Sequence, residues 1–288
     1  MTATFLNNVL DAHGGLSRWK SFDRVDATIV TGGALWAMKG LVQDPNPRRM
    51  TVWLREERSS VTRFGDPDWH TEFVPDRIAI VRSNDSVVAE RRDPRAAFAG
   101  HVMTTPWDPL HRAYFNGYAL WTYLTTPFLL AAPGVEVVEM EPWQEGQETW
   151  RVLRAQFPKW IATHSQVQIF YFGEDLLLRR HDYNVDVAGG FSAIQLVSDH
   201  IEADGIRLPS KRRIYRAGAN RRPLLDTLMV SIDISDVHFS RPAAPGRRNR
   251  PAFASDPSVP RDAPVREARG LAALASGLAL LRHHHAPA

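Results

Sequence analysis

The chain has 288 residues, 44% hydrophobic and 10% aromatic, enough for one large domain or two small ones with a sizeable core. It contains no cysteine, which excludes disulfides, thiolate nucleophiles, cysteine-ligated zinc and iron–sulfur clusters. The net charge of +3 is unevenly placed: residues 241–288 hold eight Arg and three acids (+5), which leaves 27 basic and 29 acidic residues (−2) in the rest. Nucleic-acid binding is not expected, because such a surface is normally a basic patch on the folded part.

The N-terminus lacks the features of an export signal. It has no basic segment and no long apolar run, and Asp11 comes early. The most apolar region, 120–132, contains Thr and Pro and is shorter than the roughly 20 residues that a membrane helix needs. We therefore expect a cytoplasmic protein without a membrane span.

The first 92 residues predict one helix followed by strands. Apolar residues from Phe5 to Leu16 recur at helical spacing, and Gly14-Gly15 weakens this helix near its end or divides it into two turns. Alternation and turn residues then predict short strands. These are Val25–Thr31, Leu35–Lys39, Arg48–Leu54, Glu57–Phe64, Trp69–Val74, Arg77–Arg82 and Ser86–Arg91.

The pattern becomes helical over residues 94–132. Asp93 and Pro94 are typical of a helix start, and Asp108 before Pro109 is most simply the N-cap of a second, longer helix. That helix is aromatic around most of its circumference, which is typical of a buried helix. Pro127 kinks or stops it.

Strand patterns return after residue 134. They are separated by short turns and cover Val135–Met140, Glu148–Phe157, Ser165–Phe172, Leu176–Val185, Phe191–Glu202, Ile206–Tyr215 and Leu225–Val237. Hairpin-length links favour an antiparallel meander of about a dozen strands in all. A sheet that wide curls, and the aromatic helices are the candidates to cover its concave face. The expected fold is α+β, mainly antiparallel β: a large curved sheet over residues 1–239, wrapped around central aromatic helices.

The last 49 residues, 240–288, are rich in Pro, Arg and Ala and predict a disordered tail. A short helix is conceivable over 271–281. It would be either a frayed end or a segment that contacts the body, a protein partner or a membrane surface.

The sequence of elements resembles the lipoprotein-sorting (LolA/LolB-like) family. The resemblance rests on the starting helix with His13-Gly14-Gly15-Leu16, the central helices, the strand meander and the strand–turn–strand stretch 169–183. It covers roughly residues 5–239 and implies a half-open barrel with helices as a lid over an apolar cavity that holds acyl chains or other hydrophobic molecules. The chain shows neither the export signal nor the lipid-anchoring cysteine of exported members, and no ligand-contacting residue is transferred.

No phosphate-binding or nucleophile-elbow motif is present, so candidate chemistry falls on histidines. His101 and His111 flank the segment that enters the long helix, with Asp108 between them. Two histidines and a carboxylate suit metal binding, acid–base work, or capping and hydrogen bonding. Of these alternatives we do not expect metal binding. We also expect no other cofactor.

His181 and Tyr183 alternate on a strand, so they share one face while Asp182 points to the other. They are either an acid–base pair on a concave wall or a pair at the rim of the core. One arginine from each of the segments 179–180 and 211–213 could also face inward, where it would need an anion as partner.

The leading hypothesis is a protein that binds a lipid, polyketide or similar hydrophobic molecule in the cavity of its curved sheet. The nine tryptophans either pack the core or partly line this cavity, and the expected ligand contacts are Tyr114, Tyr118, Trp121 and Trp107. The rival is a cofactor-free cyclase, isomerase or hydrolase on the same scaffold, with His101, His111, His181 and Tyr183 as acid–base groups. A third alternative is an interaction protein that uses its tail.

Overall fold

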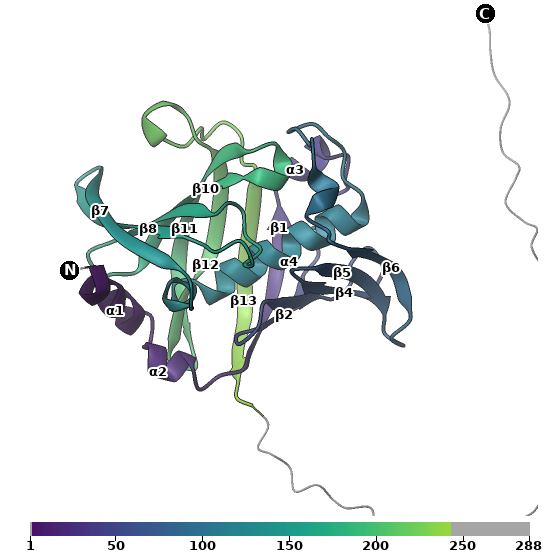
Figure 1. The fold of residues 1–288 in the computed structure, drawn as a ribbon, viewed down its shortest axis with the longest axis horizontal. Helices are drawn as coiled ribbons and strands as arrows, with labels where there is room; N and C mark the ends of the chain where they lie inside the picture. Colours follow the sequence, from purple (N-terminus) through teal and green to yellow (C-terminus); the bar gives the residue numbers. More distant parts are fainter. Residues whose placement is uncertain (1, 243–288) are drawn as a thin grey trace, which may run out of the picture. The chain divides into compact units, whose positions relative to one another are not determined.

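The computed structural model describes residues 2–242, and within them 13 strands form one antiparallel sheet. The strands are β1 (Arg24–Gly32), β2 (Arg48–Trp53), β3 (Arg58–Val61), β4 (Trp69–Val74), β5 (Arg77–Arg82), β6 (Val87–Arg92), β7 (Glu136–Glu145), β8 (Glu148–Gln156), β9 (Val167–Phe172), β10 (Leu178–Val185), β11 (Phe191–Ala203), β12 (Ile206–Arg216) and β13 (Val230–Ser240). Their order is β6-β5-β4-β3-β2-β1-β13-β12-β11-β10-β9-β8-β7. The predicted fold is confirmed: β1 pairs with β13, the edges β6 and β7 do not pair, and the curved sheet stays a half-open barrel (Figure 1).

The helices are few. They are α1 (Thr2–Ala12), α2 (Leu16–Trp19), α3 (Leu35–Met38) and α4 (Pro109–Thr125), with short 3₁₀ turns η1 (Ala96–Phe98), η2 (Phe128–Ala131), η3 (Asp186–Ala188) and η4 (Ala219–Arg221). The glycine pair after α1 divides the first helix from α2, because both glycines have positive φ. The helix expected near Pro94 amounts to η1 alone.

The alternation of side chains along the strands places the core residues on one face of the sheet. In β1, Val25, Ala27, Ile29 and Thr31 are buried, and the residues between them are more exposed. This period of two places every second side chain of the strand against the central helix and its neighbours.

Helix α4 lies across the concave face of the sheet (Figure 1). Asp108 is its N-cap, as predicted: its side chain accepts the backbone N–H of His111, and His111 accepts that of Asp108 in a capping box. Every residue from Ala113 to Thr125 is buried, which confirms the predicted buried helix. Gly117 allows a close approach to β4, since a Cβ there would lie 2.4 Å from the Phe73 ring.

One predicted strand is wrong. The segment expected as a strand over Leu35–Lys39 is the short helix α3. Gly33 has φ +108° and passes close to the carbonyl of Met229, and the N–H of Leu35 donates to that carbonyl. The segment has no β-branched residue, and a single helical turn buries Leu35 and Trp36 together.

The predicted tail and its short helix over 271–281 lie outside the described residues. Within residues 2–242, no helix combines the length and apolar character that crossing a membrane requires.

Candidate functional site

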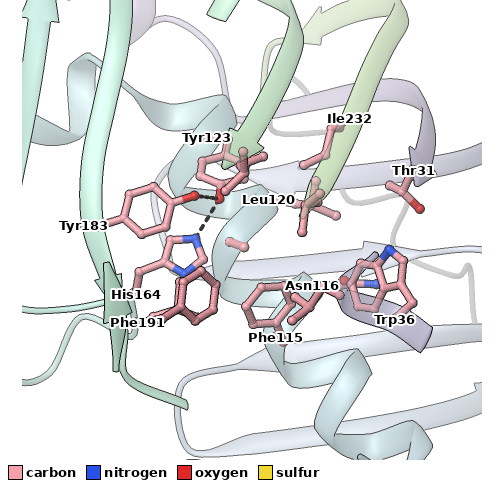
Figure 2. Close-up of a pocket in the computed structure, with 15 residues that line it drawn as sticks. Thr31, Trp36, Phe115, Asn116, Leu120, Tyr123, His164, Tyr183, Phe191 and Ile232 are labelled. Atoms are coloured by element: carbon pink, nitrogen blue, oxygen red, sulfur yellow. Dashed lines mark hydrogen bonds between the residues drawn. The ribbon is translucent and has the colours of Figure 1, made fainter. Parts of the chain in front are cut away.

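The space between α4 and the sheet is almost filled. The enclosed cavity there measures about 20 Å³, room for about one water molecule (Figure 2). Its lining comes from α3, α4 and several strands: Thr31, Leu35, Trp36, Phe115, Asn116, Ala119, Leu120, Tyr123, His164, Tyr183, Val185, Phe191, Ile214, Val230 and Ile232. The aromatic side chains of α4 therefore occupy the volume in which the sequence predicted a ligand.

A buried hydrogen-bonded chain forms one wall of this cavity (Figure 2). The Tyr123 hydroxyl lies 2.7 Å from His164 Nε2 and 2.7 Å from the Tyr183 hydroxyl. Burial lowers the pKa of His164 to about 3 and raises the pKa of Tyr123 to about 12. At neutral pH both groups are therefore uncharged, and Tyr123 and His164 share a hydrogen bond between neutral partners.

Arg212 stands at the other end of this chain. It is fully buried and donates to Gln195 Oε1 at 2.7 Å and to the backbone carbonyl of Tyr123 at 2.7 Å. Gln195 in turn donates to the Tyr183 hydroxyl at 3.2 Å. The sequence allowed one inward arginine from each of two segments: Arg212 of segment 211–213 is inward, whereas Arg180 of segment 179–180 pairs with Asp182. Among the described residues no carboxylate pairs with Arg212, and neutral amide and carbonyl oxygens accept from it instead.

The structure supports the predicted face of His181 and Tyr183. Their rings lie 4.7 Å apart on the inner face, while Asp182 pairs with Arg180 on the outer face. His181 is fully buried, its Nε2 lies 2.6 Å from Gln168 Oε1, and burial holds its pKa well below the ordinary value. Both groups are sealed in the core, so acid–base work by them stays a prediction.

His101 and His111 also come together, with ring centroids 5.0 Å apart beside Phe98. His111 Nδ1 accepts from the backbone of Asp108, so its Nε2 donates to Ala97 O at 3.3 Å, and the ring serves the capping box. Across residues 2–242 no group of three or more His, Cys, Asp or Glu side chains suits a metal ion. This pair and the His181 pair occupy different places, with no ring contact or hydrogen bond between them.

Of the four predicted ligand contacts, three lie in the core and one lies beside a groove. Tyr114, Tyr118 and Trp107 are buried in the aromatic core, where the two tyrosine rings lie 5.4 Å apart. Trp121 is 6% exposed, donates to the carbonyls of Trp53 and Glu56, and borders an open groove.

This groove, here called the C-terminal groove, lies at the C-terminal end of α4 and has a volume of about 700 Å³. Thirteen of its eighteen lining residues are apolar, and Trp160 is 62% exposed beside it. The lining residues are Leu16, Trp19, Lys20, Leu54, Arg55, Glu56, Glu57, Val74, Pro75, Trp121, Thr125, Phe128, Leu129, Ala131, Ala132, Pro133, Trp160 and Ile161. Its size and composition are those of a small-molecule site.

Glu57 is a half-buried ionisable residue of the groove. Its Oε2 accepts the backbone N–H of Ala162 at 3.0 Å, and its Oε1 is buried without a partner. Burial raises the pKa of Glu57 to about 8, against the opposing effect of the Ala162 hydrogen bond and the Arg95 charge. No sequence signal indicated this raised pKa, since Glu57 stands between the charged residues Glu56 and Arg58 at the start of the predicted strand Glu57–Phe64.

No family model matches the chain, and no curated protein matches it. Among solved structures, it is similar to a LolA superfamily protein from Nitrosomonas europaea (11% identity, TM-score 0.48, covering 85% of this chain and 96% of that one). It is also similar to a DUF1329 family protein from Desulfovibrio piger (10% identity, TM-score 0.46, 84% and 95%). A third is a putative outer membrane lipoprotein-sorting protein domain from Vibrio parahaemolyticus (8% identity, TM-score 0.48, 83% and 94%). Lipoprotein-sorting proteins, which the sequence resembles, are thus among the structures to which the chain is similar, and ligand and activity rest on its own residues.

Proposed function

We propose that the protein binds a hydrophobic small molecule, such as a lipid or polyketide, in the C-terminal groove. The observation that carries the proposal is an open groove of about 700 Å³ lined mainly by apolar side chains. The concave face of the sheet beneath α4 offers space for only about one water molecule. The proposed site therefore lies beside the end of the helix rather than beneath it.

The carboxyl of Glu57 adds no charge to the groove at neutral pH. With a pKa of about 8, Glu57 is protonated at neutral pH and presents a carboxylic acid instead of a carboxylate. The charged residues Lys20, Arg55 and Glu56 are exposed members of the lining. An apolar molecule that covers Trp160 and Pro133, both exposed in the groove lining, would remove their surface from water, at about 25 cal/mol per Å².

Binding is tested by filling the groove. Native mass spectrometry and solvent extraction of purified protein identify any co-purified molecule, and titration with the neutral dye Nile red measures occupancy. In Ala131→Trp the indole enters the groove from the exposed side of η2, and we expect at least a tenfold loss of dye affinity. Ala99→Trp, at an exposed alanine outside the groove lining, is the matched control and keeps wild-type affinity. Equal affinities in the two variants contradict the proposal.

A second candidate is an acid–base enzyme that acts on a molecule of the same class. The observation that favours it is Glu57, because a carboxyl that is protonated at neutral pH beside a groove suits a general acid. Once a co-purified molecule supplies the substrate, Glu57→Gln should keep its binding and lose its turnover. Single replacement of His111 and His181 by Ala tests the histidines predicted from the sequence, and turnover that survives both changes refutes their role.

A further inference from the structure

A second groove, here called the N-terminal groove, lies at the N-terminal end of α4 and measures about 810 Å³. It is formed by the α3–β2 connection, the β3–β4 connection and the first turn of α4. Its lining combines apolar side chains with three arginines: Leu41, Val42, Gln43, Asp44, Asn46, Pro47, Arg48, Arg63, Phe64, Gly65, Asp66, Pro67, Trp69, Ile80, Pro109 and Arg112. The apolar groove described above and this one share no lining residue.

Arg48 contributes a buried cation to this groove. Arg48 is 3% exposed, and its Nη2 donates to the Thr31 hydroxyl at 2.5 Å. Its Nε is buried and has no hydrogen-bond partner. A buried guanidinium N–H without a hydrogen-bond acceptor destabilises the fold, so an acceptor bound at this position would be stabilising.

Arg112 contributes the second cation from the first turn of α4. Its Nη1 donates to Val42 O at 2.9 Å, while Nε and Nη2 are buried without partners. The guanidinium lies 4.8 Å from the Trp36 ring and 5.8 Å from the Phe64 ring, and these rings hold it in place. Two free N–H groups on one rigid fork match the two oxygens of a carboxylate or phosphate.

The charges of the groove do not cancel. Neither Arg48 nor Arg112 has a carboxylate within ion-pair distance among the described residues. Burial and, as a smaller cause, the charge of Arg48 lower the pKa of Arg112 to about 10, so Arg112 remains protonated at neutral pH and the two cations repel each other. Asp44 acts on both, but its carboxylate accepts from the backbone and side chain of Asn46.

We propose that Arg48 and Arg112 form a binding site for an oxyanion, the carboxylate or phosphate group of a small molecule, in the N-terminal groove. The anion would accept from the three unpartnered nitrogens and neutralise the like-charge pair. The apolar neighbours Leu41, Phe64 and Trp69 would contact an organic remainder of the ligand. Gln43, whose amide donates to Thr31, lies beside Arg48 and would form part of the wall.

The test is isothermal titration of the full chain with inorganic phosphate, hexyl phosphate and hexanol in a phosphate-free, low-salt buffer. We expect hexyl phosphate to bind, and Arg112→Gln and Arg48→Gln each to weaken it at least tenfold. Arg112→Lys, which keeps the charge but loses the fork, should weaken it about three- to tenfold. Arg49→Gln is the control: it removes the exposed arginine that follows Arg48 on β2 but lies outside the groove lining, and it should change affinity less than threefold.

The outcomes separate the sources of the anion. Hexyl phosphate binding at least tenfold tighter than inorganic phosphate indicates an organic anion, and equal affinities indicate a free inorganic one. Hexanol binding as tightly as hexyl phosphate, or no binding of either phosphate, overturns the proposal. Unchanged affinity in Arg112→Gln also overturns it. Thermal unfolding without ligand verifies that each variant folds; if Arg48→Gln does not, the two Arg112 variants decide.

Discussion

Replacing Glu57 by Gln should change the pH dependence of stability. The folded-state pKa of Glu57 is raised from 4.5 to about 8 by burial. In the unfolded chain the carboxyl ionises near 4.5, whereas in the folded protein it keeps its proton until about 8. The unfolded state thus binds fewer protons in this window, and the free energy of unfolding falls as pH rises through it, by about 5 kcal/mol in total. The uncharged Gln removes this loss.

We therefore expect Glu57→Gln to exceed the wild type in free energy of unfolding by about 1 kcal/mol near pH 5 and by about 4 kcal/mol near pH 8. Urea unfolding at both pH values, followed by tryptophan fluorescence, measures the difference. Glu56→Gln is the matched control, because Glu56 is an exposed neighbour in the same turn and should show no such change. A difference between Glu57→Gln and the wild type that stays constant from pH 5 to pH 8 would refute the reasoning.

Two further substitutions test the packing around α4. In Gly117→Ala the new methyl group would lie 2.4 Å from the Phe73 ring, so α4 and β4 must separate. We expect urea titration to show a loss of about 2 kcal/mol in the free energy of unfolding. Stability equal to that of the wild type would contradict the close approach. Tyr123→Phe removes the hydroxyl that bridges His164 and Tyr183. The same titration should show a loss of about 1–3 kcal/mol in the free energy of unfolding. An unchanged free energy of unfolding would show that the bridge does not stabilise the fold.

Much of the fold could be predicted because its signals are local. The alternation of β4 and β5 gave both strands with the bounds that the structure has. Asp108 before Pro109 predicted the start of α4, and the aromatic character of the helix predicted its burial. The segment 35–38 was mistaken for a strand, because its conformation depends on contact with Met229, nearly two hundred residues later in the chain.

Much less of the candidate site than of the fold could be predicted from the sequence. Alternation placed His181 and Tyr183 on one face and brought one arginine of segment 211–213 inward. It gave no indication that Tyr123 and His164 complete the hydrogen-bonded chain, since the two residues come from a helix and a loop. Whether the predicted site residues act on a ligand stays a prediction.

The sequence by itself determined the class of the molecule: a cysteine-free chain, a wide antiparallel sheet and one buried aromatic helix. These follow from composition and from periods of two and 3.6 residues, which depend only on neighbours along the chain. Only the tertiary structure decided that α4 fills the barrel and that Glu57 becomes a neutral acid at its C-terminal end. It also decided that Arg48 and Arg112 line one groove near its N-terminal end, without an ion-pair partner among the described residues. Burial of a charge is a property of everything packed around it, and those neighbours come from segments far apart in the sequence.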